Sequence, residues 1–230
     1  MDINIISLGT MDYQRSLKIQ EKLLLMRQQD RINDTLILVE HPPVLTLGRR
    51  GDYTNIVASK ELLKKQGVCI YEVNRGGDVT YHGPGQIVGY LIFDLNNYDQ
   101  DIKNFVAKIE YGIINLLKNE YNIAAYVKDK KYTGVWVDEK KIAAIGIAVK
   151  RWVTMHGFAF NVNTVLEHYR WINPCGITDK GVNSLQSILG ENLEMEKVMT
   201  QVAHYLCESF HSAAVFRDRE WIDQVIGGIE

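Results

Sequence analysis

Residues 68–95 read VCIYEVNRGGDVTYHGPGQIVGYLIFDL. Two strand-like runs, Val68–Val73 and Gln86–Leu95, enclose a connection, Arg75–Gln86, that holds four glycines together with arginine, threonine, tyrosine and histidine. Glycine lets a backbone approach another group closely and expose its N–H groups. The stretch therefore predicts two strands joined by a ligand cradle. A plain turn between strands is the alternative, although it would need fewer glycines.

The glycine pattern differs from the usual nucleotide-binding motifs. It has neither the Gly-x-x-x-x-Gly-Lys-Ser/Thr order of a phosphate-binding loop nor the Gly-x-Gly-x-x-Gly order of a dinucleotide turn. Nucleotide chemistry is therefore not indicated by this segment.

Strands and helices alternate along the rest of the chain. Apolar periodicity predicts strands at 3–8, 35–39, 44–47, 68–73 and 86–95, helices at 12–31, 59–66 and 101–121, a meander of short strands after 121, and a helix over 195–210. No repeat and no Pro/Gly/Ser-rich linker interrupts this order. We expect residues 1–230 to form one mixed α/β domain, a single mixed-sheet domain flanked by helices.

Composition narrows the class of protein. The 230 residues are 46% hydrophobic and 23% charged, which is typical of a globular chain and not of a disordered or fibrous one. The longest apolar runs are far shorter than the roughly 20 residues of a membrane-crossing helix. Residues 1–6, MDINII, lack a signal peptide's basic and apolar regions, so we expect a cytoplasmic protein.

The charge balance argues against nucleic acid as a partner. The chain has 26 basic and 28 acidic residues, a net charge of −2, and so no overall basic field. Residues 128–151 depart from this balance with seven basic and three acidic side chains. They form either solvated strands with charged turns or a docking site for an acidic partner.

Of the three cysteines, one has the setting of a nucleophile. Their odd number and the absence of a Cys-x-x-Cys pair argue against disulfides and zinc. Cys69 and Cys207 lie in regular elements and are expected in the core. Cys175 lies between Pro174 and Gly176, ahead of a segment that starts like a helix. A helix end and a nearby cation would lower its pKa and supply thiolate.

A nucleophilic cysteine needs a companion group, and the candidates are His82, His156 and Lys141. Lys141 begins a small aliphatic run in which its stem can be partly buried. It can equally be an exposed charge next to Lys140, and His156 can be a structural histidine. The remaining histidines have no metal-ligand spacing, so we expect no metal and no cofactor.

Five segments, taken together, resemble the lipoyl/octanoyl transferases. They are EHPPVLTLG (40–48), RGGDVTYHGPGQ (75–86), KIAAIG (141–146), HGFAFN (156–161) and NPCG (173–176), in the family's order, and the resemblance covers about residues 40–185. Two departures are Ala144, where many members have serine, and Asn183, where threonine is usual. The first removes a hydroxyl from the acyl pocket.

The resemblance implies a mixed α/β fold similar to the catalytic domains of biotin and lipoate protein ligases. It implies transfer of an octanoyl or lipoyl group from acyl carrier protein to a lysine of lipoyl domains, in 2-oxoacid dehydrogenases and in the glycine cleavage H protein. The donor is a thioester, so exchange onto a cysteine needs no ATP. No nucleic acid or membrane partner is implied.

By the same resemblance Cys175 carries the acyl group, and Lys141 stabilises its thiolate and later serves as base toward the incoming lysine. The implied substrate-binding residues are Arg75, Gly76, Gly77, Asp78, Val79, Thr80, Tyr81, His82, Ala144, Ile145, Gly146, Gly157, Phe158 and Ala159. Lys128, Lys130 or Lys131 is expected to steer the acidic donor.

Three other functions remain to be separated from this one. An ATP-dependent lipoate or octanoate ligase shares the fold but needs no cysteine nucleophile. A papain-like hydrolase would use Cys175 with His82 or His156, although its local signature is missing. A carrier-binding module would have no activity.

Overall fold

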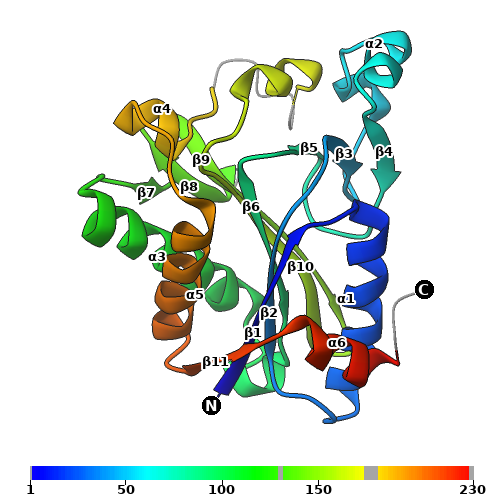
Figure 1. Ribbon diagram of the computed structural model, residues 1–230, viewed down its shortest axis with the longest axis vertical. Helices are drawn as coiled ribbons and strands as arrows, with labels where there is room; N and C mark the ends of the chain where they lie inside the picture. The colour runs from blue at the N-terminus through cyan, green and yellow to red at the C-terminus, as the bar shows by residue number, and fades with distance from the viewer. Residues whose placement is uncertain (1, 129–131, 174–180, 228–230) are drawn as a thin grey trace.

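The computed structural model, which describes residues 2–128, 132–173 and 181–227, is built around an eight-stranded mixed sheet (Figure 1). Its strands, in spatial order, are β11 (Ala213–Arg217), β1 (Asp2–Thr10), β2 (Thr35–Glu40), β6 (Gln86–Ile92), β10 (Val153–Asn161), β9 (Lys140–Lys150), β8 (Gly134–Val137) and β7 (Tyr126–Val127). β1 is parallel to both β2 and β11, and the other neighbouring strands are antiparallel. This sheet confirms the predicted fold class.

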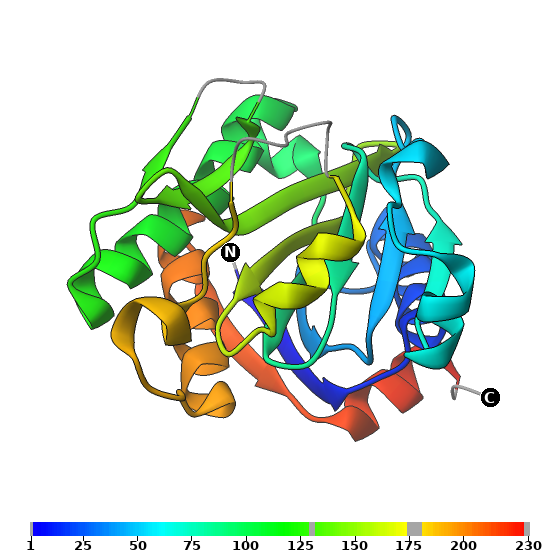
Figure 2. The same cartoon turned by 90° about the horizontal axis from the view of Figure 1, so that it is seen from above.

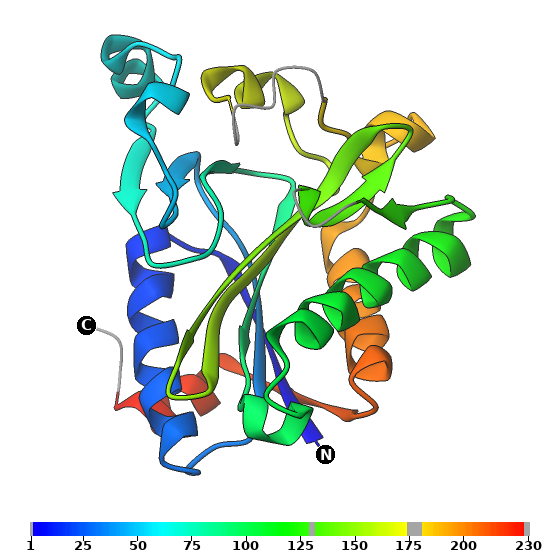
Figure 3. The ribbon, with the colours of Figure 1, turned by 180° about the vertical axis from the view of Figure 1, so that it is seen from behind.

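Both faces of the sheet are covered, because successive side chains of a strand point to opposite faces. In β2, Leu36 and Leu38 join one buried cluster and Ile37 and Val39 join the other. Helices α3 (Ile102–Tyr121) and α5 (Met195–Ser209) cover the first face. Helices α1 (Tyr13–Gln28) and α6 (Arg219–Ile226) cover the second, as Figure 3 shows from behind.

A second, three-stranded sheet lies beside the first. It consists of β3 (Val44–Leu47) between β4 (Cys69–Glu72) and β5 (Val79–His82), and helix α2 (Lys60–Lys65) packs on it (Figure 2). β5 arises within the segment that the sequence predicts as a connection. Part of the predicted ligand-binding connection is therefore a strand, and it pairs with β3. Four shorter helices complete the described chain: η1 (Tyr53–Asn55), η2 (Leu95–Tyr98), η4 (Leu166–Trp171) and α4 (Leu185–Leu189).

Two details differ from the sequence predictions. Cys69 is exposed, because β4 is an edge strand of the small sheet, so its expected place in the core is wrong. Cys207 is buried as expected, and burial raises its pKa to about 11. The strand β11 was not predicted, since its mostly exposed residues show no apolar alternation and it forms by pairing with β1.

No helix in the described residues is both long enough and apolar enough to cross a membrane.

A buried ion pair fastens the end of α1 to the central sheet. Asp34 accepts hydrogen bonds from Arg27 Nε at 2.8 Å, the Tyr98 hydroxyl at 2.8 Å and the Asp94 backbone N–H at 2.9 Å. The Asp34 side chain is only 3% exposed, whereas that of Asp30, another partner of Arg27, is 85% exposed. Asp34 therefore binds the Arg27 guanidinium inside the protein, whereas Asp30 binds it at the surface in contact with water.

We predict that Asp34→Ala lowers the free energy of unfolding by about 3–5 kcal/mol, because it leaves the Arg27 charge buried with its main partner removed. Asp30→Ala is the matched control and is expected to cost at most about 1 kcal/mol, since that pair is screened by water. Urea denaturation of both variants measures the difference. Equal losses would contradict this account.

Candidate active site

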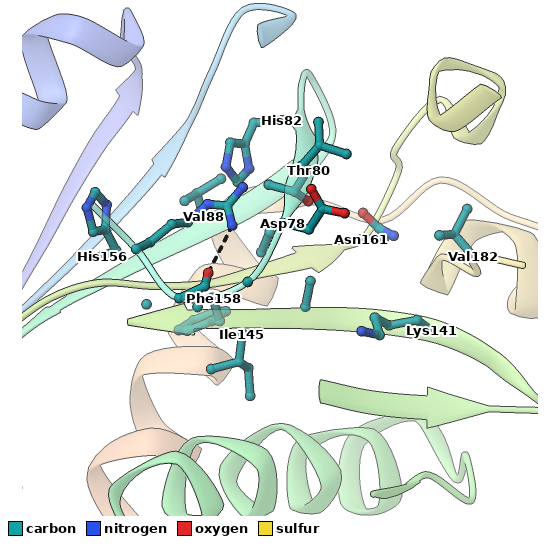
Figure 4. A pocket seen from close by; sticks show the side chains of 18 of the residues that line it. Asp78, Thr80, His82, Val88, Lys141, Ile145, His156, Phe158, Asn161 and Val182 are labelled. Carbon is teal, nitrogen blue, oxygen red and sulfur yellow. Dashed lines mark hydrogen bonds between the residues drawn. The ribbon is translucent and has the colours of Figure 1, made fainter. Parts of the chain in front are cut away.

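A pocket of about 130 Å³ lies between residues 75–80 and the strands β6, β9 and β10 (Figure 4). Its floor is made of small residues. Ala144 and Gly146 of β9 are paired with Ala159 and Gly157 of β10, so all four lie on one face of the sheet. Because these four residues have a methyl group or no side chain, space remains over this face and forms a channel along the sheet.

Residues 75–77 form the roof of the pocket, and a buried arginine holds them in place. Arg75 is 8% exposed, and its Nη2 donates to the Thr46 carbonyl at 2.7 Å while its Nε donates to the Thr46 hydroxyl at 3.1 Å. The Gly76 N–H donates to the Ile147 carbonyl of β9 at 2.9 Å. A side chain at Gly146 would place Cβ 2.7 Å from the Gly76 oxygen, so this close approach requires glycine.

The structure brings together nearly all the described residues that the sequence assigned to the site. Lys141 and the assigned substrate-binding residues all line the pocket, apart from Tyr81. The Asp78 carboxylate also accepts a hydrogen bond from Asn55 Nδ2 at 2.7 Å. Tyr81 points the other way, and its hydroxyl is 2.8 Å from His168 Nδ1, because neighbouring residues of β5 alternate between faces.

Lys141 lies at the start of β9, at one end of the pocket. Its ammonium donates to the Thr133 carbonyl at 3.0 Å and lies 5.0 Å from the centre of the Trp136 ring, within cation–π range. The Lys141 N–H donates to the Gly181 carbonyl and its own carbonyl accepts from the Asn183 N–H. Lys141 is thus a half-buried cation beside the pocket rather than a free surface charge.

Cys175 lies outside the described residues, so its predicted partnership with Lys141 is not part of this geometry. The described chain nevertheless resumes beside the lysine, since Gly181 and Val182 line the pocket.

Two histidines line the pocket and are held neutral. Burial lowers the pKa of His82 to about 3 and that of His156 to about 4. His82 Nδ1 is 2.7 Å from the Gln86 amide oxygen. Behind them, the buried His41 bridges the Met11 carbonyl and the Tyr90 hydroxyl, and burial lowers its pKa to about 4. Neutral imidazoles at the inner wall can give and accept hydrogen bonds without adding charge.

Sequence reasoning missed several pocket residues. They are Tyr13, Val88, Tyr90, Trp136, Ile142, Asn161, Tyr169, Gly181 and Val182, together with His156, which was considered only as a companion of the cysteine. Asn161 stood in one of the five family segments, and that signal could have identified it. Tyr13 and Trp136 come from other elements with no motif of their own. No group of three potential metal-binding side chains occurs among the residues that the structure describes.

The buried neutral histidines predict acid sensitivity. The unfolded chain protonates each histidine near pH 6.5, whereas folded His41, His82 and His156 take up a proton only near pH 3–4. The unfolded state therefore binds more protons between these limits, and stability falls as pH decreases from 6.5 toward 4. Each histidine contributes up to about 1.4 kcal/mol per pH unit.

We predict that His41→Gln makes the free energy of unfolding less dependent on pH. The slope should fall by about 1.4 kcal/mol per pH unit, the contribution of one proton, as measured by urea denaturation at several pH values. His204→Gln, on the exposed side of α5, is the control for replacing a histidine outside this buried group. A slope that is the same in all three proteins would show that His41 does not titrate in this way.

Comparison with known proteins agrees with this architecture. By fold, the chain is similar to lipoate-protein ligase A crystallised with ATP, with a TM-score of 0.80 at 16% identity over 99% of this chain and 93% of that one. It is less similar to the biotin protein ligase of Aquifex aeolicus, with a TM-score of 0.52 at 12% identity over 91% and 69% of the two chains. At these identities the likeness concerns the fold alone.

Sequence relatives are much closer. The chain is 53% identical to an octanoyltransferase of Caldicellulosiruptor saccharolyticus over 98% of this chain and 96% of that one. It is also 53% identical to an octanoyltransferase of Desulforamulus reducens over 99% of both. The model of the lipoyl protein ligase A/B catalytic domain matches residues 12–207. The resemblance seen in the sequence is thereby confirmed, and the chain belongs to the lipoyl protein ligase A/B catalytic domain family.

Proposed function

We propose that this protein is an octanoyltransferase that moves an octanoyl group from acyl carrier protein to a lysine of lipoyl domains. The observation that carries the proposal is the channel over Ala144, Gly146, Gly157 and Ala159, which leads to Lys141 in a chain 53% identical to octanoyltransferases. A channel floored by small residues suits a flexible apolar chain. The acceptors are lipoyl domains of 2-oxoacid dehydrogenases and the glycine cleavage H protein. We place the reaction in the cytoplasm and regard residues 1–230 as one catalytic domain.

The chemistry that we propose passes through a thioester on Cys175. The cysteine thiolate attacks the donor carbonyl, the carrier's thiolate leaves, and the octanoyl group remains on the sulfur. The acceptor amine then attacks this thioester, an amide forms, and the cysteine sulfur leaves. Neither step needs ATP, since a thioester is exchanged for a thioester and then for a more stable amide.

Lys141 is the proposed partner of that sulfur. Gly181, six residues after Cys175, accepts a hydrogen bond from the Lys141 N–H, which supports a position of the cysteine near the lysine. An ammonium there stabilises the thiolate. Once the acyl group has removed the negative charge, Lys141 gives up its proton more easily, and the leaving thiolate of the carrier can accept it. The neutral amine of Lys141 can then take a proton from the incoming lysine, whose ordinary pKa of about 10.4 would otherwise keep it protonated.

Intact-mass measurement tests the nucleophile. Mixed with octanoyl-carrier protein and no acceptor, the protein should gain one octanoyl group that neutral hydroxylamine removes. Cys175→Ala should gain none, because the attacking sulfur is missing. Cys69→Ala is the matched control, since Cys69 is an exposed free thiol, and it should be acylated like the unaltered protein. Acylation of Cys175→Ala would exclude Cys175 as the acyl carrier.

An ATP-dependent ligase is the main alternative, because the fold is shared with lipoate-protein ligase A. Free octanoate with ATP should leave a lipoyl domain unmodified, whereas octanoyl-carrier protein without ATP should modify it. The reverse result would assign a ligase instead. Free octanoate as the main product would indicate a hydrolase, and binding of the carrier without acylation would indicate a binding module.

The proposed donor-steering charges include one described lysine. Lys128 lies 4.5 Å from the centre of the Trp136 ring, on the side of the pocket that holds Lys141, and it pairs with Glu139. Lys130 and Lys131 lie outside the described residues. Because Glu139 already offsets part of its charge, Lys128 should attract an acidic carrier only moderately.

We predict that Lys128→Glu raises the KM for the carrier several-fold and weakens its dependence on salt, with a smaller change in kcat. Lys18→Glu, an exposed charge reversal on α1, is the control and should change neither. Initial rates at several salt concentrations measure both effects. An unchanged KM in Lys128→Glu would remove Lys128 from the docking site.

A further inference from the structure

A carboxylate and the Lys141 ammonium bind opposite sides of one peptide group, the peptide between Thr133 and Gly134. Lys141 Nζ donates to its carbonyl at 3.0 Å, and its N–H donates to Glu110 Oε1 at 2.9 Å. Glu110 belongs to α3, which packs beside β8, the neighbour of the strand that carries Lys141 (Figure 1). An anion therefore lies at one end of a peptide dipole and the cation at the other. Bonds arranged in this way polarise and strengthen one another.

The backbone fixes the direction of this peptide. Gly134 has φ +127°, a conformation that L side chains rarely adopt, and a Cβ there would lie 2.3 Å from the Ala143 carbonyl oxygen. The Trp136 indole N–H donates to the Tyr132 carbonyl at 2.9 Å, so the chain just before the peptide is held as well. The peptide carbonyl is therefore directed at Lys141 by the fold.

The Glu110 carboxylate has no oppositely charged neighbour at helical spacing. The residues three and four positions away in the sequence are apolar, and they are Val106, Ala107, Ile113 and Ile114. The Glu110 side chain is half-buried, and burial raises its pKa, while the Gly134 N–H and the Lys141 charge oppose that rise. Attraction between Glu110 and Lys141 is thus part of the electrostatics at this end of the pocket.

The charged neighbours of Lys141 along the sheet offset one another. Lys128 lies 4.5 Å from the centre of the Trp136 ring that Lys141 also approaches, and it pairs with Glu139. The Glu139 carboxylate also accepts from the Tyr126 hydroxyl. Lys140, the preceding residue, is exposed, so water screens its charge.

On the pocket side, the charged groups have partners of their own. The Arg75 guanidinium donates to the Thr46 carbonyl, and the Asp78 carboxylate accepts from Asn55. Burial shifts the pKa values of the pocket's other titratable side chains so that they are neutral at pH 7, and these are Tyr13, His82, Tyr90, His156 and Tyr169. Glu110 is therefore the carboxylate that shares a hydrogen-bonded peptide with Lys141.

The charge of Glu110 matters most after the cysteine has been acylated. In the proposed reaction, the thiolate that first attracts Lys141 becomes a neutral thioester. Glu110 then remains as an anion that favours the protonated form of Lys141. The lysine must lose this proton before it can take one from the incoming amine, so an anion at this position controls when Lys141 becomes a base.

We propose that Glu110 is a positioning residue for Lys141 that acts through the Thr133–Gly134 peptide. It directs the carbonyl that holds the ammonium, and it sets the pH at which that ammonium becomes a base. The second role rests on the proposed function, in which Lys141 changes from cation to base between the two half-reactions. Glu110 holds the peptide N–H and touches neither the acyl group nor the acceptor.

The pH dependence of the second half-reaction tests this role. Purified octanoyl-enzyme is mixed with a lipoyl domain, and single-turnover rates are measured between about pH 6 and about pH 10. In Glu110→Gln the midpoint of the rise in rate should lie about one pH unit lower, because the charge is lost while an amide oxygen can still accept the Gly134 N–H. Glu21→Gln, an exposed glutamate on α1 at the other face of the sheet, is the matched control and should keep the original midpoint.

Two further variants separate the charge from the hydrogen bond. Glu110→Asp keeps the charge on a shorter side chain and should restore most of the midpoint. Glu110→Ala removes both charge and acceptor, so it should lower the midpoint and also reduce the plateau rate about tenfold, because the peptide carbonyl is no longer directed. If the variants lose rate while the midpoint stays unchanged, Glu110 has only a structural role and the inference is overturned.

An NMR titration of the Lys141 nitrogen decides the electrostatic link independently of transfer. In the Cys175→Ala protein, which has no thiolate, adding Glu110→Gln should lower the Lys141 midpoint by about one pH unit. If Glu110→Gln does not fold, the Glu110 carboxyl signal of the Cys175→Ala protein should shift as Lys141 titrates. An unmoved Lys141 midpoint, or a Glu110 signal that ignores this titration, would overturn the inference. Absence of octanoyl transfer by the unaltered protein would instead refute the proposed function, and the titration would still test the link.

Discussion

The hydrogen bonds of the buried Arg75 guanidinium hold the pocket together. Arg75 belongs to the segment that leads into the small sheet, and it donates to both the carbonyl and the hydroxyl of Thr46 in β3. The next residue, Gly76, donates to β9 of the large sheet. A buried cation is stable only where its donors are satisfied, so this arginine fixes where the two sheets meet. The pocket is the space left under that junction.

Glycine and alanine decide the shape of this space. Gly146 passes under the Gly76 carbonyl at a distance that no Cβ permits, and Gly48 is equally close to the Gly77 carbonyl, where a Cβ would come within 2.5 Å. The same absence of side chains that lets the roof approach β9 also opens the channel beside it. Close backbone packing and a binding site for a flexible chain thus have one structural cause.

The pocket holds both charged and neutral titratable groups. At one end Lys141 is a cation held by the Thr133 carbonyl and the face of Trp136. Elsewhere in the pocket, burial keeps His82 and His156 neutral. The Lys141 cation favours chemistry on an anionic sulfur at its end, whereas the Arg75 guanidinium, which also lines the pocket, is engaged in hydrogen bonds to Thr46 and the Gly76 carbonyl.

The sequence by itself determined the mixed α/β class, the main strands and helices, and most residues of the pocket. It could do so because apolar periodicity records which face of an element is buried, and because glycine-rich segments mark close backbone approach. It could not show that Tyr81 turns away while Tyr13 and Trp136 face the pocket, since these orientations depend on pairing between distant strands and on helix packing. Only the tertiary structure decided that residues 75–77 cover β9 and that His156 Nδ1 is buried with no hydrogen-bond partner among the described residues, because both result from contacts among segments far apart in the chain.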